Sequence, residues 1–275
     1  MPKITKQTTK TSKHIRKTGS VLDNAIPIED MPDTGIKMCS YGRGKTGKTT
    51  LTCSFPKPLL LIGTEDGTKS VKSLKGIDFL RLNHSSQIDE IVEAIAETYK
   101  TLVLDTGGGL QDMILKEILG LDDIPMEKSW GMAARDQWQS CGVQTKERLS
   151  ALLNLADRGI NVVIIAHERN FSDEGSSDLL VPTVGAALTP STAGWLNGAC
   201  DYLCQTFLRE KTISKKAMVG KKETMMISRT GKTEYCLRVG PHPVYMTGFR
   251  RVHTKGEIIS DVIVDPDYDK IIKMI

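Results

Sequence analysis

The residues best suited to chemistry lie in one short segment of the chain, residues 42–49, which read GRGKTGKT. The segment fits the pattern G-x-x-x-x-G-K-[ST] of a phosphate-binding loop without a mismatch. In such a loop the glycines let backbone N–H groups close around phosphate oxygens, and Lys48 would reach the β- and γ-phosphates. The hydroxyl of Thr49 would ligate Mg²⁺. The residues expected to hold the nucleotide are Gly42, Arg43, Gly44, Lys45, Thr46, Gly47, Lys48, Thr49 and Thr50.

The segments on either side of this loop support the interpretation. Residues 36–41 predict a short strand that enters the loop, and residues 49–53 predict the helix that leaves it. A helix that begins there directs the positive end of its dipole at the phosphates. No base-reading motif is visible, so these residues alone do not distinguish ATP from GTP.

Two carboxylates stand at the ends of predicted apolar strands. Asp105 ends the strand TLVLD, and there it can hold Mg²⁺ opposite the Thr49 hydroxyl, directly or through water. Glu65 follows the strand LLLIG. Because the carboxyl ends of parallel strands line the ligand crevice of an open sheet, Glu65 is expected to orient and deprotonate the water that attacks the γ-phosphate. Asp66 is the competing candidate for this role.

Two basic residues complete the candidate catalytic set, to which Lys48 also belongs. His167 ends the strand NVVIIAH and is expected to contact the γ-phosphate and report its loss to the long loop 168–190. Arg250 lies in the last predicted strand, and a positive group often reaches the γ-phosphate from a neighbouring subunit. A solvated basic strand is the alternative interpretation of that region.

The length of 275 residues suits one large domain, or one domain with appendages. No apolar run approaches the roughly 20 residues of a membrane span, and no hydrophobic stretch follows the basic N-terminus, so neither a membrane protein nor a secretory signal is expected. Six scattered cysteines, at 39, 53, 141, 200, 204 and 236, indicate reduced thiols in a cytoplasmic protein.

The charge is unevenly distributed along the chain. The net charge is +4, yet residues 1–18 carry six Lys/Arg and no acid, and residues 208–255 carry twelve Lys/Arg and three acids. The remainder of the chain is therefore acidic. Such asymmetry is typical of proteins that bind a polyanion such as nucleic acid, although a solvated surface with a solubilising tail would also produce it.

Strands alternate with helices up to residue 200, which predicts an α/β fold with a mainly parallel twisted sheet flanked by helices. Ser86 is expected to cap a helix over 86–99, with Asp89 at the capping-box position. The other expected elements up to this point are strands over 77–82 and 161–167 and a helix over 135–156. After residue 200 we expect antiparallel strands over 201–208, 224–228, 234–239 and 244–251, with a hairpin turn at 229–232.

Five segments together resemble the RecA-like P-loop ATPases, and more closely the phage-type nucleotide-binding proteins that include single-strand annealing ATPases. The segments are GRGKTGKTT, LLLIGTEDG, TLVLDT, NVVIIAHE and VYMTGFRR, and the likeness spans roughly residues 35–255. Residues 1–32 are rich in Lys, Thr and Ser and poor in large apolar groups, which predicts a basic disordered tail. The resemblance implies a RecA-like P-loop NTPase core over 33–255, and residues 256–275 are left as a C-terminal tail segment. It also implies that Arg250 acts across a subunit interface and that the loop after His167 lies near DNA.

The function that the resemblance implies is DNA-stimulated ATP hydrolysis with Mg²⁺, on single-stranded DNA, in recombination, annealing, replication or repair. A phage-derived protein in the host cytoplasm, assembled as a homo-oligomeric ring or filament, fits this hypothesis, and a single-strand binding protein is a further candidate partner. Two alternatives stay open. One is a nucleotide-gated DNA-binding scaffold with little hydrolysis, and the other is a small-molecule kinase whose lid would be the basic stretch 209–222.

Overall fold

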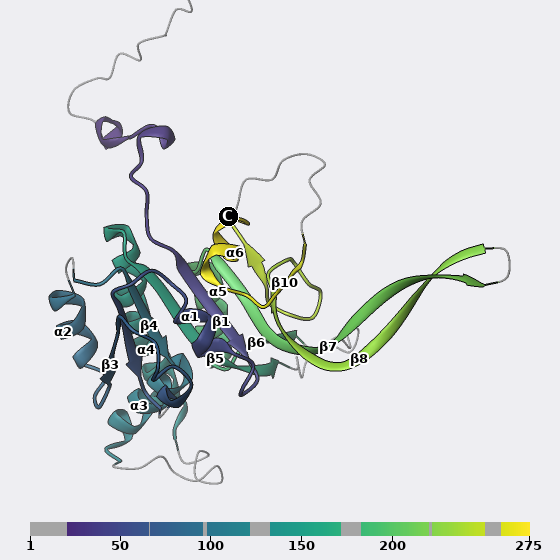
Figure 1. Ribbon diagram of the computed structural model, residues 1–275. Helices are drawn as coiled ribbons and strands as arrows, with labels where there is room; N and C mark the ends of the chain where they lie inside the picture. The colour runs from purple at the N-terminus through teal and green to yellow at the C-terminus, as the bar shows by residue number, and fades with distance from the viewer. Residues whose placement is uncertain are drawn as a thin grey trace, which may run out of the picture. The chain divides into compact units, whose positions relative to one another are not determined.

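The computed structural model describes residues 21–65, 67–95, 98–121, 133–171, 183–219, 222–250 and 260–275 (Figure 1). The chain divides into two units, the first ending at Asp33 and the second comprising Thr34–Ile275. The described part of the first unit contains two short 3₁₀ helices, η1 (Val21–Asn24) and η2 (Ile28–Asp30). Most of the predicted disordered tail lies outside the described residues. Within them, no helix is both long and apolar enough to cross a membrane.

A mainly parallel sheet forms the centre of the second unit, and its order within the described residues is β10-β8-β7-β1-β5-β4-β2-β3. Its strands are β1 (Lys37–Gly42), β2 (Leu59–Gly63), β3 (Ile77–Arg81), β4 (Thr101–Asp105), β5 (Asn161–Phe171), β6 (Thr183–Ala186), β7 (Tyr202–Val219), β8 (Lys222–Arg238), β9 (Gly248–Phe249) and β10 (Val262–Val264). The strands from β7 to β3 in this order are parallel, whereas β8 and β10 add antiparallel edges.

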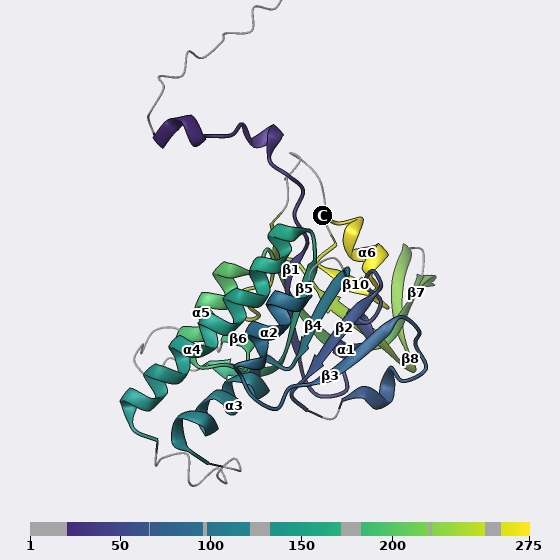
Figure 2. The same cartoon turned by 90° about the vertical axis from the view of Figure 1, so that its left-hand side faces the viewer.

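The central strands β2, β4 and β5 contain continuous buried apolar runs because both faces of the sheet are covered. Alternate residues of β4 enter different cores: Leu102 and Leu104 pack with the helices of one face, and Val103 packs with those of the other. The first face carries α2 (Gln87–Ala94), α3 (Gly107–Leu119), α4 (Arg135–Leu153) and α5 (Pro190–Ala199), as Figure 2 shows. The second core includes residues of α1 (Lys48–Thr52) and α6 (Tyr268–Ile272).

The strand order determines the type of fold. Strand β5 lies between β1, which enters the phosphate-binding loop, and β4, which ends in Asp105. The predicted RecA-like P-loop NTPase fold, with a mainly parallel sheet between helices and additional antiparallel strands, is thereby confirmed. The register also aligns the carboxyl ends of the strands, because Gly42 pairs with His167 and Gly63 with Asp105.

The start of α2 differs from the prediction. Ser86 has helical backbone angles and its side chain makes no capping hydrogen bond. The side chain of Gln87 makes the hydrogen bonds at the turn before the helix, where its Oε1 accepts from the backbone N–H groups of Asn83 and His84. The capping prediction was wrong because the backbone N–H groups that a Ser86 cap would satisfy, those of Ile88 and Asp89, donate to the backbone carbonyl oxygens of Ser85 and Ser86 instead.

The predicted hairpin turn at residues 229–232 is also wrong, since one continuous strand, β8, passes through it. The pairing register between β7 and β8 shifts here, between Glu210 and Thr212. Gly231 has a φ of 70°, and its N–H donates to Glu210 Oε1. A glycine in the left-handed region suits a bulge as well as a turn, so the local sequence does not separate the two.

The strands β7 and β8 extend beyond the rest of the sheet. Strand β7 pairs with β1 only as far as Thr206, and from there its partner is β8 alone, as can be followed in Figure 1. We call residues 208–219 and 222–234 the β7–β8 arm.

Two other regions differ from the predictions. Strands β5 and β6 pair antiparallel within the expected loop 168–190. In the described part of the expected strand 244–251, the strand is limited to β9.

The last residues of the chain belong to the sheet and its second core. The sequence predicts residues 256–275 as a separate tail segment. In the described part of that segment, β10 pairs antiparallel with residues 236–238 of β8, and Ile263 and Ile271 are buried in the second core.

Candidate functional site

The loop between β1 and α1 has the backbone conformation that phosphate binding requires. Gly47 has a φ of 86°, which an L-residue rarely adopts, and Lys45 has a φ of 65°. The left-handed backbone favours glycine at this position, and a Cβ atom on Gly47 would lie 3.2 Å from Cδ1 of the exposed Tyr235 ring, which would have to shift by a few tenths of an ångström. The loop therefore forms a cradle whose shape depends on the absence of a side chain.

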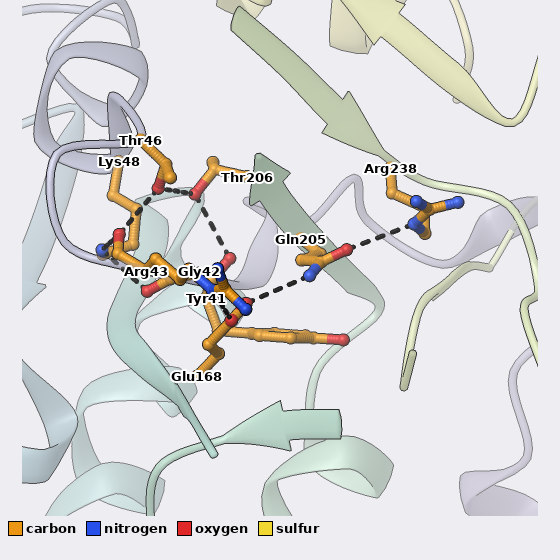
Figure 3. Close-up of polar contacts among 9 residues, drawn as sticks. All are labelled: Tyr41, Gly42, Arg43, Thr46, Lys48, Glu168, Gln205, Thr206 and Arg238. Atoms are coloured by element: carbon orange, nitrogen blue, oxygen red, sulfur yellow. Dashed lines mark hydrogen bonds and ion pairs between the residues drawn. The ribbon is translucent and has the colours of Figure 1, made fainter. Parts of the chain in front are cut away.

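Lys48 is a buried cation held on its own loop. Its side chain is only 7% exposed, and burial lowers the pKa of its ammonium group. The Nζ atom donates to the carbonyl oxygens of Gly42 at 3.0 Å and Arg43 at 2.7 Å (Figure 3). Phosphate oxygens are stronger acceptors than these neutral carbonyls, so the arrangement fits an anion in the loop.

Thr49 and Asp105 face each other across the floor of the site. The Thr49 hydroxyl donates to Asp105 Oδ2 at 2.8 Å, and burial raises the pKa of that carboxyl. The two groups come from the first turn of α1 and the last residue of β4. A hydroxyl and a carboxylate are the hard oxygen ligands that Mg²⁺ prefers, so the residues fit the predicted metal.

Glu65 and His167 lie beside this pair. Thr106 Oγ1 donates to Glu65 Oε1 at 3.2 Å, and Nε2 of His167 lies 3.8 Å from Glu65 Oε2. Contact with His167 is the largest cause that lowers the pKa of Glu65, and burial acts in the opposite direction. The separation of 3.8 Å exceeds the length of a hydrogen bond, and the contact is an ion pair only when His167 is protonated. The competing candidate Asp66 lies outside the described residues.

These side chains share one cavity of about 870 Å³. The cavity brings together ten residues that the sequence predicts, namely Gly44, Lys45, Thr46, Gly47, Lys48, Thr49, Thr50, Glu65, Asp105 and His167. The predicted residues Gly42 and Arg43 are not part of its lining. The remaining lining residues are Leu51, Gly67, Lys69, Ser70, Thr106, Tyr235, Asp265, Pro266 and Asp267. A cavity of this size accommodates a small-molecule ligand, and its polar groups converge at the loop end.

A family model described as an AAA domain, AAA_24, matches residues 34–251. The chain belongs to this AAA domain family. No curated protein sequence matches the chain. Two solved structures are similar to it. The flagellar accessory protein FlaH from Methanocaldococcus jannaschii is 12% identical, with a TM-score of 0.41, and the match covers 85% of this chain and 86% of that chain. A KaiC-like protein from the hyperthermophilic archaeon Pyrococcus horikoshii OT3 is 14% identical, with a TM-score of 0.36, and the match covers 85% of this chain and 90% of that chain.

The AAA domain is a P-loop ATPase domain of the RecA-like type. This type of domain binds a nucleotide, typically with Mg²⁺, in keeping with the cradle around Lys48 and the Thr49–Asp105 pair. Assignment to the phage-type annealing ATPases stays a prediction.

A network of polar side chains that the sequence analysis missed connects the phosphate-binding loop of the AAA domain to the neighbouring strands (Figure 3). Arg43 Nε donates to Glu168 Oε1 at 2.7 Å, and Gln205 Nε2 donates to Glu168 Oε2 at 3.1 Å. Arg238 Nε then donates to Gln205 Oε1 at 3.2 Å. The only signal in the sequence is that Glu168 follows the strand-end His167.

Thr206 makes a second connection from β7 to the loop. Its hydroxyl lies 2.7 Å from the hydroxyl of Thr46 and donates to the carbonyl oxygen of Tyr41 at 3.3 Å. Thr206 is buried and stands 160 residues from Thr46 in the sequence. The AAA domain thus holds its loop from the side of β7 as well as from β1.

Arg250 lies away from the cavity of the AAA domain. Its guanidinium binds Asp201 Oδ1 at 2.8 Å and the carbonyl oxygen of Gly198 at 2.8 Å. Asp201 in turn donates its N–H to the carbonyl oxygen of Lys37, at the amino end of β1. This end of the sheet is opposite to the phosphate-binding loop. Contact of Arg250 with a neighbouring subunit therefore stays a prediction, and the adjacent Arg251 lies outside the described residues.

Proposed function

We propose that this AAA domain hydrolyses ATP and uses the nucleotide cycle to act on single-stranded DNA. The observation that carries the hydrolytic part is the convergence, in one cavity, of a buried lysine, a Thr49–Asp105 pair and the carboxylate of Glu65. Phosphoryl transfer requires these parts: a cation on the phosphates, a metal site and a group that orients the attacking water.

Lys48 and the backbone N–H groups of residues 43–49 would bind the phosphate oxygens. Lys48 gives up its carbonyl partners Gly42 and Arg43 for stronger anionic acceptors. Thr49 and Asp105 would hold Mg²⁺, which when bound neutralises charge on the β- and γ-phosphate oxygens. These groups place charge where it develops during phosphoryl transfer.

Glu65 would accept the proton of the attacking water. Its carboxylate is ionised at neutral pH, as in an ordinary glutamate, and because the lowered pKa makes it a weaker base, its main contribution would be to orient the water. Thr106 donates a hydrogen bond to one carboxylate oxygen, and Nε2 of His167 lies 3.8 Å from the other. His167 is also joined through β5 to β6, so loss of the γ-phosphate can reach that hairpin.

The β7–β8 arm would contribute much of the DNA contact. Residues 208–219 and 222–234, which form the arm, contain seven Lys/Arg and three acids, and two of those acids, Glu210 and Glu234, are paired with arginines of the same hairpin. Lys211 and Lys232 are exposed on the described part of the arm. Aromatic residues are only 5% of the chain, so phosphate contacts rather than base stacking would supply most of the affinity.

The finer proposals follow from this assignment. The protein would act in recombination, annealing, replication or repair, in the host cytoplasm if a phage encodes it, and a single-strand binding protein is a candidate partner. A homo-oligomeric ring or filament on DNA would place Arg250 of one copy near the site of the next.

The test is an ATPase assay with single-stranded DNA, duplex DNA and no DNA, each at low and high salt. We expect stimulation by single-stranded DNA that falls steeply with salt. Absence of turnover in every condition would contradict hydrolysis and favour the nucleotide-gated scaffold. Phosphate transfer to a small acceptor, without response to DNA, would favour a kinase, although the stretch 209–222 offered as a kinase lid is part of strands β7 and β8 in the described residues.

A further inference from the structure

The cavity continues past the phosphate-binding loop to a wall that no catalytic assignment uses. This wall consists of Tyr235 on β8 and of residues Asp265, Pro266 and Asp267, which connect β10 to α6. Tyr235 is 47% exposed, and its ring edge packs against the backbone of Gly47. An aromatic ring thus lines the cavity at the loop where the triphosphate would lie.

The connecting turn is fixed by contacts on both sides, so the wall is preformed. The N–H of Asp265 donates to the carbonyl oxygen of Tyr235 at 2.8 Å. The N–H of Tyr268 donates to Ser54 Oγ at 2.9 Å, and the Tyr268 ring packs edge-on against Phe55 with ring centroids 5.0 Å apart. These contacts tie the turn to β8 and to the end of α1.

The polar groups of this turn point to a ligand that donates hydrogen bonds. Asp265 and Asp267 present carboxylates, and Pro266 has no N–H. Lys270 engages both oxygens of Asp267, because its N–H donates to Oδ1 and its Nζ lies 3.9 Å from Oδ2, whereas Asp265 is exposed. The Asp265 carboxylate repels phosphate, so this end of the cavity suits the uncharged part of a nucleotide. A flat ring beside acceptors matches a nucleobase that carries an exocyclic amino group.

We propose that Tyr235 and the Asp265–Asp267 turn form the nucleobase subsite of this protein, and that the subsite selects a base with an exocyclic amino group, such as adenine, over hypoxanthine. The ring of Tyr235 stacks on the base, and the Asp265 carboxylate accepts from the amino group. The proposal rests on nucleotide binding as part of the proposed function, but it does not depend on hydrolysis or on DNA.

The experiment measures the dissociation constants of ATP, ITP and inorganic tripolyphosphate, with Mg²⁺, by displacement of a fluorescent nucleotide. The variants are Tyr235→Ala, Tyr235→Phe and Asp265→Asn, with Lys48→Ala as the control for phosphate binding. Asparagine tolerates the left-handed backbone of Asp265, whose φ is 47°, so this variant changes the charge without straining the turn.

We expect Tyr235→Ala to weaken ATP binding about tenfold, in line with the loss of one stacked base, and to leave tripolyphosphate binding unchanged. Tyr235→Phe should bind ATP like the wild type. Wild type should prefer ATP to ITP, and Asp265→Asn should reduce that preference. Lys48→Ala should weaken binding of all three ligands.

Three outcomes would overturn the subsite while leaving the P-loop assignment intact. They are unchanged ATP binding in Tyr235→Ala, an equal loss of tripolyphosphate and ATP binding in that variant, and equal affinity of the wild type for ATP and ITP. If the wild type binds none of the three ligands, the proposed function fails and the subsite fails with it.

Discussion

At the scale of single residues, the site is a balance between burial and charge. Burial lowers the pKa of Lys48 and raises the pKa of Asp105, because each charged form loses water. Each group is retained in the site by a polar partner, the loop carbonyls for Lys48 and the Thr49 hydroxyl for Asp105. Glu65 is more exposed, which suits a residue that must exchange a proton with water.

We predict that Glu65→Gln binds ATP with nearly unchanged affinity but hydrolyses it about 10²-fold or more slowly, because the amide cannot accept the proton of the attacking water. Nucleotide titration and phosphate release measure the two effects separately. The Asp66→Asn variant is the matched control. Normal turnover in Glu65→Gln, combined with loss in Asp66→Asn, would transfer the role to Asp66.

The dependence of the rate on pH tests the contact between His167 and Glu65. His167 lowers the pKa of Glu65, and it has the same effect on Asp105. In His167→Ala both carboxyls lose a positive neighbour, so their pKa values rise and protonation begins at higher pH. The acid limb of kcat/KM against pH should therefore shift upward.

A matched control for this shift is His84→Ala, which removes an exposed histidine beside Glu117, outside the cavity. The control should leave the acid limb in place. An acid limb that stays where it is in His167→Ala, or that moves downward, would contradict the assigned contact.

At the scale of elements, three parallel strands hold the phosphate-binding loop together. Strand β1 leads into the loop. Glu168 on β5 accepts a hydrogen bond from Arg43 of the loop, and Thr206 on β7 is hydrogen-bonded to Thr46 of the loop. The loop is thus supported from both neighbours of β1. Such support restricts the loop to the conformation that receives phosphate, which lowers the ordering cost of binding.

We predict that Thr206→Val destabilises the fold by about 1–3 kcal/mol, because it removes the polar partner of buried groups while keeping the shape of the side chain. ATP affinity should fall as well, since Thr46 loses its contact with β7. Urea unfolding and nucleotide titration measure the two effects. Thr212→Val, at an exposed position of the same strand, is the control, and equal stability of the two variants would contradict the role of Thr206.

At the scale of the whole molecule, the charge is segregated. The basic β7–β8 arm extends from one side of the sheet. The part of the chain outside residues 1–18 and 208–255 carries a net negative charge. The same two strands pass the cavity, where Tyr235 and Gln205 lie at its wall and beside its loop. Nucleotide binding and polyanion binding would therefore share structural elements.

We predict that the double variant Lys211→Gln/Lys232→Gln reduces stimulation of the ATPase by single-stranded DNA and leaves the basal rate unchanged. Loss of two phosphate contacts should reduce the slope of log affinity against log salt by about 1.4. Lys72→Gln/Lys75→Gln makes the same charge change at exposed positions near β3 and should have little effect. Equal losses in the two double variants would indicate a general charge effect without a specific arm.

The sequence by itself determined the phosphate-binding loop and the type of fold. The loop depends on residues within eight positions of each other, and strands such as β2 and β4 are recognisable because burial on both faces makes them mostly apolar. The strand-end positions of Glu65, Asp105 and His167 followed from the same pattern, since parallel strands end at one edge of a sheet.

Only the tertiary structure decided which distant residues complete the site. Glu168 reaches Arg43 over 125 positions, and Tyr235 meets Gly47 because β8 pairs with β7 beside the loop. Residues 265–267 line the cavity because β10 adds to the same edge. Such contacts depend on strand order and register, which arise from the packing of the whole sheet. Gly231 shows the same dependence on pairing. Its local sequence predicts a hairpin turn, whereas the pairing of β7 with β8 produces a register shift within a continuous strand.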